Sequence, residues 1–159
     1  MKNGSFPWVD SHCHLEMLKG DIETILEYAW EDGMPFCISI GTGISANRKV
    51  VDLCERFENV YGTLGFHPHH ASRFEHQHLD WIRETIRSEQ KIVAVGECGF
   101  DYYYNRSGKE DQMEAFTAQL DLALETDVPV VIHSREADME TRDVLDAYRG
   151  KNLKGVVHC

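Results

Sequence analysis

Short apolar runs alternate with longer amphipathic segments along the whole chain. The runs are rich in Val and Ile and bounded by Gly or Pro, which is typical of buried β-strands. They cover residues 8–14, 36–42, 61–67, 92–98, 129–134 and 153–159. The segments between them place apolar residues three and four positions apart, which predicts helices with one buried face. These predicted helices cover residues 21–32, 46–58, 79–89, 109–127 and 136–149, with Asp21 at the N-cap of the first.

Predicted strands and helices follow one another in turn, which favours an α/β fold of parallel strands joined by helical crossovers. Nearly every predicted strand ends in a polar residue. A closed barrel gathers all strand C-termini around one mouth, whereas an open sheet gathers them only near its switch point. The Gly-x-Gly-x-x-Gly loop of dinucleotide-binding sheets does not follow the first strand. The pattern therefore favours a TIM-type (βα) barrel, here of about six βα units.

The first predicted strand ends in a His-x-His pair, His12 and His14. Side chains alternate across a strand, so both imidazoles project to the same side. Two imidazoles in this arrangement can bind one divalent cation. Two surface histidines at a strand end would give the same sequence. The pair therefore supports a metal site only if later strands also end in metal-ligand residues.

Further ligand-type residues stand at the ends of four later strands. They are His67 with His69 and His70, then Glu97, His133 and His158. Imidazoles with a carboxylate form the mixed set of donors that Zn²⁺, Mn²⁺, Co²⁺ or Fe²⁺ accept. One ion needs only three protein ligands, so the surplus predicts two divalent ions that hold a water between them. Glu97 is the expected bridge, because a group between two dications must be anionic.

Most of the other polar and aromatic residues near these strand ends have two possible roles. Arg135 either binds a substrate phosphate through its planar guanidinium or forms an ordinary ion pair at a helix start. His67 either contacts a substrate phosphate or caps the loop before Pro68. Asp10 projects to the same side of the strand as His12, and it is expected to contact a metal ligand without binding the metal itself. The run Tyr102–Tyr104 either stacks on a base or packs over the barrel rim.

The formal net charge of −11, with no basic run, limits the kinds of partner. It argues against binding duplex nucleic acid through a broad cationic face, so any phosphate must be held locally by metal ions and a few basic groups. Five cysteines without a Cys-x-x-Cys pair indicate reduced thiols and a cytoplasmic setting. No stretch approaches the roughly 18 apolar residues of a membrane span, so no membrane partner is expected.

Taken in order, several motifs resemble those of the TatD-type metal-dependent hydrolases, or TatD-related deoxyribonucleases. The motifs are DSHCHL, GFHPHH, GECGFDYYYN, KEDQMEAFTAQLDLALETDVPVVIHSREA and the closing VVHC. The resemblance implies a TIM-type barrel, two divalent metal ions (Mg, Mn, Zn, Co or Fe) and hydrolysis of DNA phosphodiester bonds, as a 3′-to-5′ exonuclease acting on single-stranded or 3′ ends.

The resemblance also implies a role for individual residues. His12 and His14 match ligands of the first metal ion, and Glu97 matches the shared carboxylate. The ligands of the other ion are matched by His133 and His158. His67 and Arg135 match positions near the substrate.

The chain departs from the family at its end, because members of the family continue past the His-Cys pair at which this sequence stops. The continuation includes a metal-binding aspartate that helps to activate the water, and nothing here matches it. We therefore expect residues 1–159 to form a single barrel domain truncated at its C-terminus, able to self-associate through its open side. Two alternatives stay open: another binuclear hydrolase, acting on an amide, lactone or phosphomonoester, or a catalytically incompetent metal-binding domain.

Overall fold

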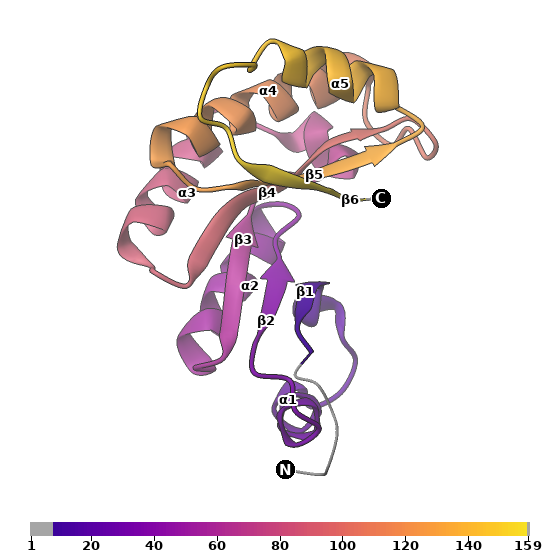
Figure 1. Ribbon diagram of the computed structural model, residues 1–159. Helices are drawn as coiled ribbons and strands as arrows, with labels where there is room; N and C mark the ends of the chain where they lie inside the picture. The colour runs from indigo at the N-terminus through magenta and orange to yellow at the C-terminus, as the bar shows by residue number, and fades with distance from the viewer. Residues whose placement is uncertain (1–7, 159) are drawn as a thin grey trace.

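A computed structural model describes residues 8–158, in which six parallel strands form one curled sheet (Figure 1). The strands are β1 (Asp10–Cys13), β2 (Cys37–Ile40), β3 (Val60–Leu64), β4 (Ile92–Asp101), β5 (Val130–Arg135) and β6 (Gly155–His158). The helices are α1 (Ile22–Glu31), α2 (Ile44–Arg56), α3 (Gln77–Ser88), α4 (Lys109–Thr126) and α5 (Asp138–Asp146). Two short 3₁₀ helices follow strand ends, η1 (Leu15–Met17) and η2 (Pro68–Arg73).

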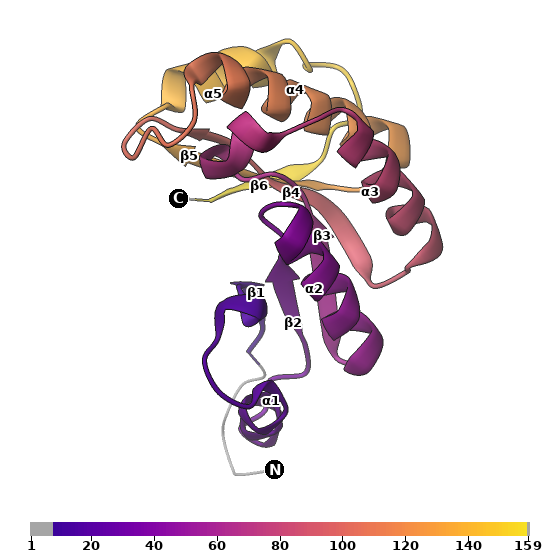
Figure 2. The ribbon, with the colours of Figure 1, turned by 180° about the vertical axis from the view of Figure 1, so that it is seen from behind.

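Each strand pairs with its neighbours in sequence, in the order β1 to β6, so the chain winds in one direction. The helices form an arc outside the curled sheet, as the front and back views show (Figures 1 and 2). Between the helices and the sheet lies the apolar core, which includes fully buried Leu26, Val50, Ile82 and Phe116. The prediction of an incomplete TIM-type barrel is confirmed, since β1 and β6 each pair on one side only.

The predicted boundaries differ from the observed ones by at most three residues. The largest error that affects the site concerns β4, which was expected to end at residue 98, before an irregular stretch 101–108. It continues instead to Asp101, paired with β5 as far as Arg135. A bulge explains the error: between Val95 and Cys98 the strand advances three residues while β5 advances two. Cys159, the last residue of the predicted final strand, lies outside the described residues.

One glycine lies within this bulge and another directly after it. Gly96 and Gly99 have φ angles of +121° and +131°, a region that favours glycine. A Cβ at Gly99 would collide with the backbone carbonyl of His133 on β5. The glycines therefore let β4 bend close to β5 and turn Glu97 toward the concave side of the sheet.

Three buried amide side chains hold the loops at the strand ends, each by bonds to both the N–H and the C=O of one residue. Asn47 on α2 binds Gly65. On α4, Gln119 binds Phe66 and Gln112 binds Asp101. These amides satisfy backbone groups that would otherwise be buried without partners. They fix the chain after β3 and the end of β4, where the candidate site lies.

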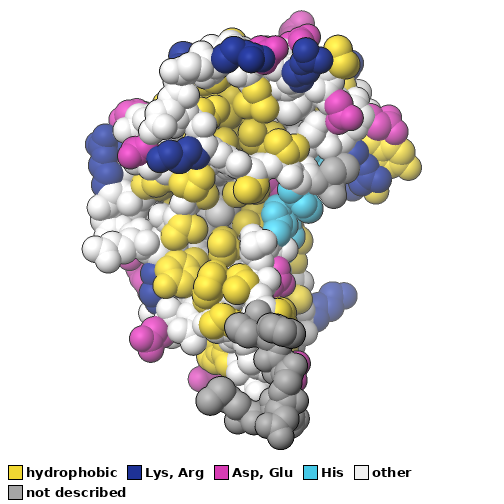
Figure 3. Space-filling model, in the orientation of Figure 1, with side chains coloured by type: hydrophobic (Ala, Val, Ile, Leu, Met, Phe, Trp, Pro, Cys, Tyr) yellow, Lys and Arg dark blue, Asp and Glu magenta, His cyan; other side chains and the backbone are white. Residues whose placement is uncertain are grey.

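No helix among the described residues combines the length and apolar character needed to cross a membrane. On the face shown in Figure 3, hydrophobic side chains gather around β6 and below it, and histidine side chains lie at the edge of this area. On β6 itself, Val156 and Val157 are 60% and 62% exposed.

Candidate metal centre

A cluster of imidazoles and carboxylates lies at the C-terminal ends of the strands. His12 comes from β1, Glu97 from β4, His133 from β5 and His158 from β6. They adjoin a cavity of about 310 Å³. Its wall consists of His14, Met17, Thr42, His67, His69, His70, Glu97, Arg106, His133 and His158. The barrel thus brings together ligand types that are far apart in the sequence.

Glu97 is the centre of this cluster, and its side chain is only 2% exposed. Its Oε2 lies 3.5 Å from Nε2 of His12. Its Oε1 lies 3.0 Å from Nδ1 of His133, 3.8 Å from Nε2 of His158 and 3.9 Å from Nε2 of His67. Burial alone would raise the pKa of Glu97, but the close His12 ring, the hydrogen bond with His133 and the charge of His67 outweigh it and hold the pKa well below its usual value. The carboxylate is therefore an anion with both oxygens facing nitrogen donors.

Two triads of potential ligand atoms share this carboxylate. In each triad the ligand atoms lie within 4.8 Å of one another. One contains His12, Glu97 and His158; the other contains His67, Glu97 and His133. A single carboxylate is therefore within reach of cations at either triad.

The first triad contains a nitrogen without a hydrogen-bond partner. Nε2 of His12 is buried and makes no hydrogen bond among the described residues, although it lies 3.5 Å from Oε2 of Glu97. The His12 ring is stacked on the His158 ring, with centroids 3.9 Å apart. A buried polar atom left unpaired is costly, and a cation bound here would satisfy it together with the carboxylate. The donor set thus fits a divalent metal ion.

His133 is held from both sides of its ring. Nδ1 lies 3.0 Å from Glu97, and Nε2 lies 3.2 Å from Oδ2 of Asp101. Asp101 is 1% exposed, and the same oxygen lies 2.8 Å from Nε2 of His69. Sequence reasoning missed Asp101 because it ended the strand too early. The signal was present, since Glu97 and Asp101 are four residues apart in a motif that a continuing strand would carry to one side.

His67 has a defined tautomer. The backbone N–H of His69 donates to its Nδ1 at 3.1 Å, so the proton of the neutral ring lies on Nε2, which faces Glu97. Burial lowers the pKa of His67 to about 3, so the ring is neutral. The capping alternative for His67 is confirmed by the bond to His69, and the same bond leaves Nε2–H as a donor directed into the cavity.

His14 lies in the cavity wall but belongs to neither triad. Its Nδ1 lies 3.2 Å from the carbonyl oxygen of Ile40 and 3.7 Å from Oε1 of Glu16. A hydrogen bond from Nδ1–H to that carbonyl leaves Nε2 of His14 with a free lone pair, as is usual for metal-ligating histidines. Asp10 accepts a hydrogen bond from the backbone N–H of His12 at 3.1 Å, so it supports the strand rather than a ligand ring.

The two arginines near the cavity stack on tyrosines. Arg135 lies 4.4 Å and 4.8 Å from the ring centroids of Tyr103 and Tyr104. Among the described residues Arg135 has no carboxylate within 4.0 Å, so the structure does not show the helix-start ion pair that was its alternative. Arg106 lies 5.5 Å from the Tyr104 ring and lines the cavity. Nothing in the sequence singled out Arg106.

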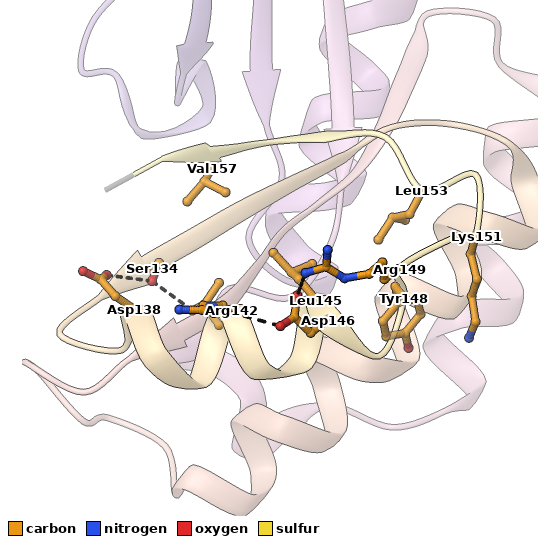
Figure 4. Close-up of a pocket in the computed structure, with 12 residues that line it drawn as sticks. Ser134, Asp138, Arg142, Leu145, Asp146, Tyr148, Arg149, Lys151, Leu153 and Val157 are labelled. Carbon is orange, nitrogen blue, oxygen red and sulfur yellow. Dashed lines mark hydrogen bonds and ion pairs between the residues drawn. The ribbon is translucent and has the colours of Figure 1, made fainter.

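A second hollow, of about 640 Å³, lies between α5 and β6 (Figure 4). Its apolar wall includes Leu145, Leu153 and Val157, and the Val157 side chain points toward α5. Asp146 there pairs with Arg149 at 2.7 Å. None of the residues that line this hollow is a His or Cys, so the imidazole ligands lie only at the smaller cavity among the residues that line these two hollows.

A protein-family model described as TatD related DNase matches residues 9–159. The uncharacterized metal-dependent hydrolase YabD of Bacillus subtilis is 30% identical over 152 residues, which are 94% of this chain and 59% of the relative. The 3′-5′ ssDNA/RNA exonuclease TatD of Pantoea ananatis is 34% identical over 140 residues, which are 87% of this chain and 54% of the relative. The chain therefore spans less than two thirds of the length of these relatives.

Solved structures show the same fold. The TatD homologue YJJV from Escherichia coli superposes with a TM-score of 0.86 at 30% identity, covering 95% of this chain and 59% of the homologue. A TatD family hydrolase from Entamoeba histolytica superposes with a TM-score of 0.83 at 22% identity, covering 96% of this chain and 58% of that protein. The second likeness concerns the fold alone.

Proposed function

Because this chain belongs to the TatD related DNase family of metal-dependent hydrolases, we propose that its site hydrolyses phosphodiester bonds of DNA with two divalent metal ions. The observation that supports this best is the position of the buried Glu97 carboxylate, whose Oε2 faces His12 while its Oε1 faces His133 and His158. Two-metal sites are a common solution for phosphodiester hydrolysis, since one ion faces the attacking oxygen and the other the leaving oxygen. The nitrogen and oxygen donors suit Mn, Zn, Co or Fe, and Mg is a further candidate.

We propose that His12 and His14 bind one ion, that His133 and His158 bind the other, and that Glu97 bridges them. The free Nε2 of His14 and the unpaired Nε2 of His12 support the first assignment. When bound, the two ions would supply Lewis acidity and a water of lowered pKa. Glu97 is the proposed catalytic residue, because its anionic carboxylate would hold both ions and help to activate the water.

His67 and Arg135 are the proposed contacts to the substrate. His67 is neutral with its proton on Nε2, so it acts as a hydrogen-bond donor to a phosphate oxygen rather than as a metal ligand. Although Nε2 of His67 lies in the second triad, a protonated nitrogen has no lone pair for a cation. Arg135 keeps its N–H groups available while its guanidinium face stacks on tyrosine rings.

The proposed substrate is single-stranded DNA, which is cleaved progressively from its 3′ end. The name of the Pantoea relative supports this choice. The net charge of −11 supports it too, since duplex binding depends on neutralising many phosphates along both strands.

We also propose a cytoplasmic setting. The described cysteines are all unpaired, namely Cys13, Cys37, Cys54 and Cys98.

The test uses purified protein, with metal content measured beside activity. Single-stranded DNA labelled at its 5′ end should shorten progressively from the 3′ end in the presence of Mn²⁺ or Mg²⁺ and stay intact in EDTA. Glu97→Gln should lose one of the two bound ions and the cleavage, because a neutral amide bridges two dications poorly. Glu114→Gln, at a position whose side chain is 63% exposed, is the matched control and should keep both.

The competing hydrolase function has its own assay in the same preparation. The Bacillus relative is named only as an uncharacterized metal-dependent hydrolase, so its name does not exclude amide, lactone or phosphomonoester substrates. Turnover of p-nitrophenyl phosphate with intact DNA would favour that class. Unchanged metal content in Glu97→Gln would contradict the bridging role, and bound metal without any turnover would favour a metal-binding domain.

A further inference from the structure

An aromatic and cationic rim borders the metal centre where β4 and β5 end. It consists of Tyr103, Tyr104, Arg106 and Arg135. The two tyrosines are 54% and 50% exposed, and their ring centroids lie 4.8 Å apart at 87°. Their exposed rings offer flat apolar faces beside a polar cavity, on which a nucleic-acid base can stack.

The two arginines of this rim pack on tyrosine rings and have no carboxylate partner among the described residues. Arg135 contacts both tyrosine rings, and Arg106 contacts the Tyr104 ring. Neither arginine has a carboxylate within 4.0 Å among residues 8–158, although the chain carries 27 acidic residues. A guanidinium stacked on a ring keeps its N–H edge free for a phosphate. The rim is therefore a local positive site on an acidic protein.

The rim is tied to the metal centre through Asp101. Its Oδ1 accepts a hydrogen bond from the backbone N–H of Tyr104 at 2.8 Å, while its Oδ2 contacts His69 and His133. The rings of His69 and Tyr104 meet edge to face, with centroids 5.5 Å apart. One carboxylate thus positions both a metal-centre histidine and the tyrosine loop, so a molecule on the rim lies at a fixed place relative to the cavity.

A second link comes from the sheet. The backbone N–H of Tyr102 donates to the carbonyl of Arg135 at 3.0 Å, which continues the pairing of β4 and β5 into the loop. Arg106 lines the cavity itself. From the cavity wall a chain of contacts leads from Arg106 to Tyr104, then to Arg135 and to Tyr103. Cationic and aromatic side chains thus follow one another, as phosphates and bases do along a single strand.

We propose that this rim binds the nucleotide next to the scissile phosphate, with its base stacked on Tyr104 or Tyr103 and its phosphate held by Arg106 and Arg135. The proposal rests on the proposed function and deepens it, because it assigns the substrate as an unpaired polynucleotide with its bases present. A stacked base must first leave the duplex, so the rim favours single strands.

The test measures binding apart from cleavage. A 5′-fluorescein oligothymidylate with phosphorothioate linkages at its 3′ end is titrated with metal-loaded protein, and fluorescence anisotropy gives the Kd. Tyr104→Leu should weaken binding about tenfold or more, since a base stacked on an aromatic ring contributes on that scale. Tyr104→Phe keeps the ring and should bind like the unmodified chain. Arg106→Gln should also weaken binding, and more at low salt than at high salt.

Matched controls lie on the far helices. Tyr28 on α1 is 69% exposed and Arg142 on α5 has a side chain that is 71% exposed, so Tyr28→Leu and Arg142→Gln should leave the Kd unchanged. An oligonucleotide that lacks the base of its 3′-terminal or adjacent nucleotide adds the substrate side. Loss of that base should weaken binding to the unmodified chain and have little further effect on Tyr104→Leu.

The outcomes separate this proposal from the proposed function. If the unmodified chain binds the oligonucleotide while Tyr104→Leu and Arg106→Gln bind it equally well, the rim proposal is wrong and the nuclease proposal stands. The same conclusion follows if removal of the base has equal effects on the unmodified chain and Tyr104→Leu. If the unmodified chain neither binds nor cleaves single-stranded DNA, both proposals fail together. Circular dichroism and melting of each variant show whether it is folded.

Discussion

Asp101 contacts His133 across two adjacent strands, with 3.2 Å between Oδ2 and Nε2. The other ring nitrogen of His133 lies 3.0 Å from Oε1 of Glu97. Burial alone would lower the pKa of His133, but the hydrogen bonds and charges of Glu97 and Asp101 outweigh it and raise the pKa above its usual value. In the absence of metal the ring is therefore protonated at a higher pH than a free histidine would be.

This contact predicts that metal binding releases a proton. A metal ion needs the neutral imidazole, so it competes with the proton on His133, and the apparent metal affinity should fall as the pH falls through the raised pKa. Titration calorimetry with Mn²⁺ in two buffers of different ionisation enthalpy measures the protons released. Asp101→Asn removes one of the charges that raise the pKa and should reduce the release near neutral pH.

Asp143→Asn on the exposed side of α5 is the control for the proton measurement. The groups that face His133 are Glu97 and Asp101 on β4, His67 and His69 near η2, and His158 on β6. Equal proton release in Asp101→Asn and in the unmodified chain would show that Asp101 does not set the protonation of the ring.

The sequence predicted the fold because each strand and helix carries its own pattern. Sequence alone identifies buried strands with polar ends and helices with one apolar face. The face of α2 that contains Val50 and Leu53 is an example. The positions of His12, Glu97, His133 and His158 at strand ends followed from the same pattern. Their convergence then needed only the rule that parallel strands end at one mouth.

Other parts of the site depend on features that sequence patterns do not report. The bulge between Val95 and Cys98 breaks the regular alternation of β4, and a strand predicted to end at residue 98 left Asp101 in a loop. Asn47 and Gln119 are polar residues in helices, and only tertiary contact shows that they hold strand-end loops. The tautomer of His67 depends on one backbone bond from His69, which no residue pattern encodes.

The close approach of β4 to β5 at Gly99 leaves no room for a side chain. Gly99→Ala should destabilise the chain several times more than Gly20→Ala. Both glycines have a positive φ, +131° and +115°, which strains any other residue. Only at Gly99 would the added Cβ also collide with a neighbouring backbone. The expected loss for Gly20→Ala is about 1 kcal/mol of strain, and for Gly99→Ala about 3 kcal/mol or more. Urea denaturation of the two variants measures the free energies of unfolding. Similar losses would show that the contact with His133 is easily relieved.

The amide of Gln119 predicts a large cost for an apolar replacement. Its Oε1 accepts from the N–H of Phe66 at 2.7 Å, and its Nε2 donates to the carbonyls of Phe66 and Ala115. Gln119→Leu would leave buried backbone groups of Phe66 unpaired, at an expected cost of about 2–4 kcal/mol in the free energy of unfolding. Gln90→Leu, at an exposed position, is the control and should change stability little. Equal melting temperatures for the two variants would remove Gln119 from the support of the site.

The unpaired edges of the sheet predict self-association of the polypeptide of residues 1–159. β6 pairs only with β5, and its Val156 and Val157 are 60% and 62% exposed. At the other edge, Trp8 and Val9 are 44% and 41% exposed beside β1. An exposed apolar edge strand offers unpaired backbone groups and apolar area to another chain.

Sedimentation velocity over a range of concentrations tests this association. The sedimentation coefficient should rise with concentration, and Val157→Lys should reduce the rise, because a charge on an edge strand opposes pairing. Met139→Lys on α5 is the matched control, since Met139 is 64% exposed but lies away from the edge, and it should associate like the unmodified chain. A chain that sediments as a monomer at every concentration would contradict association. A rise that Val157→Lys leaves unchanged would assign the contact to a surface other than β6.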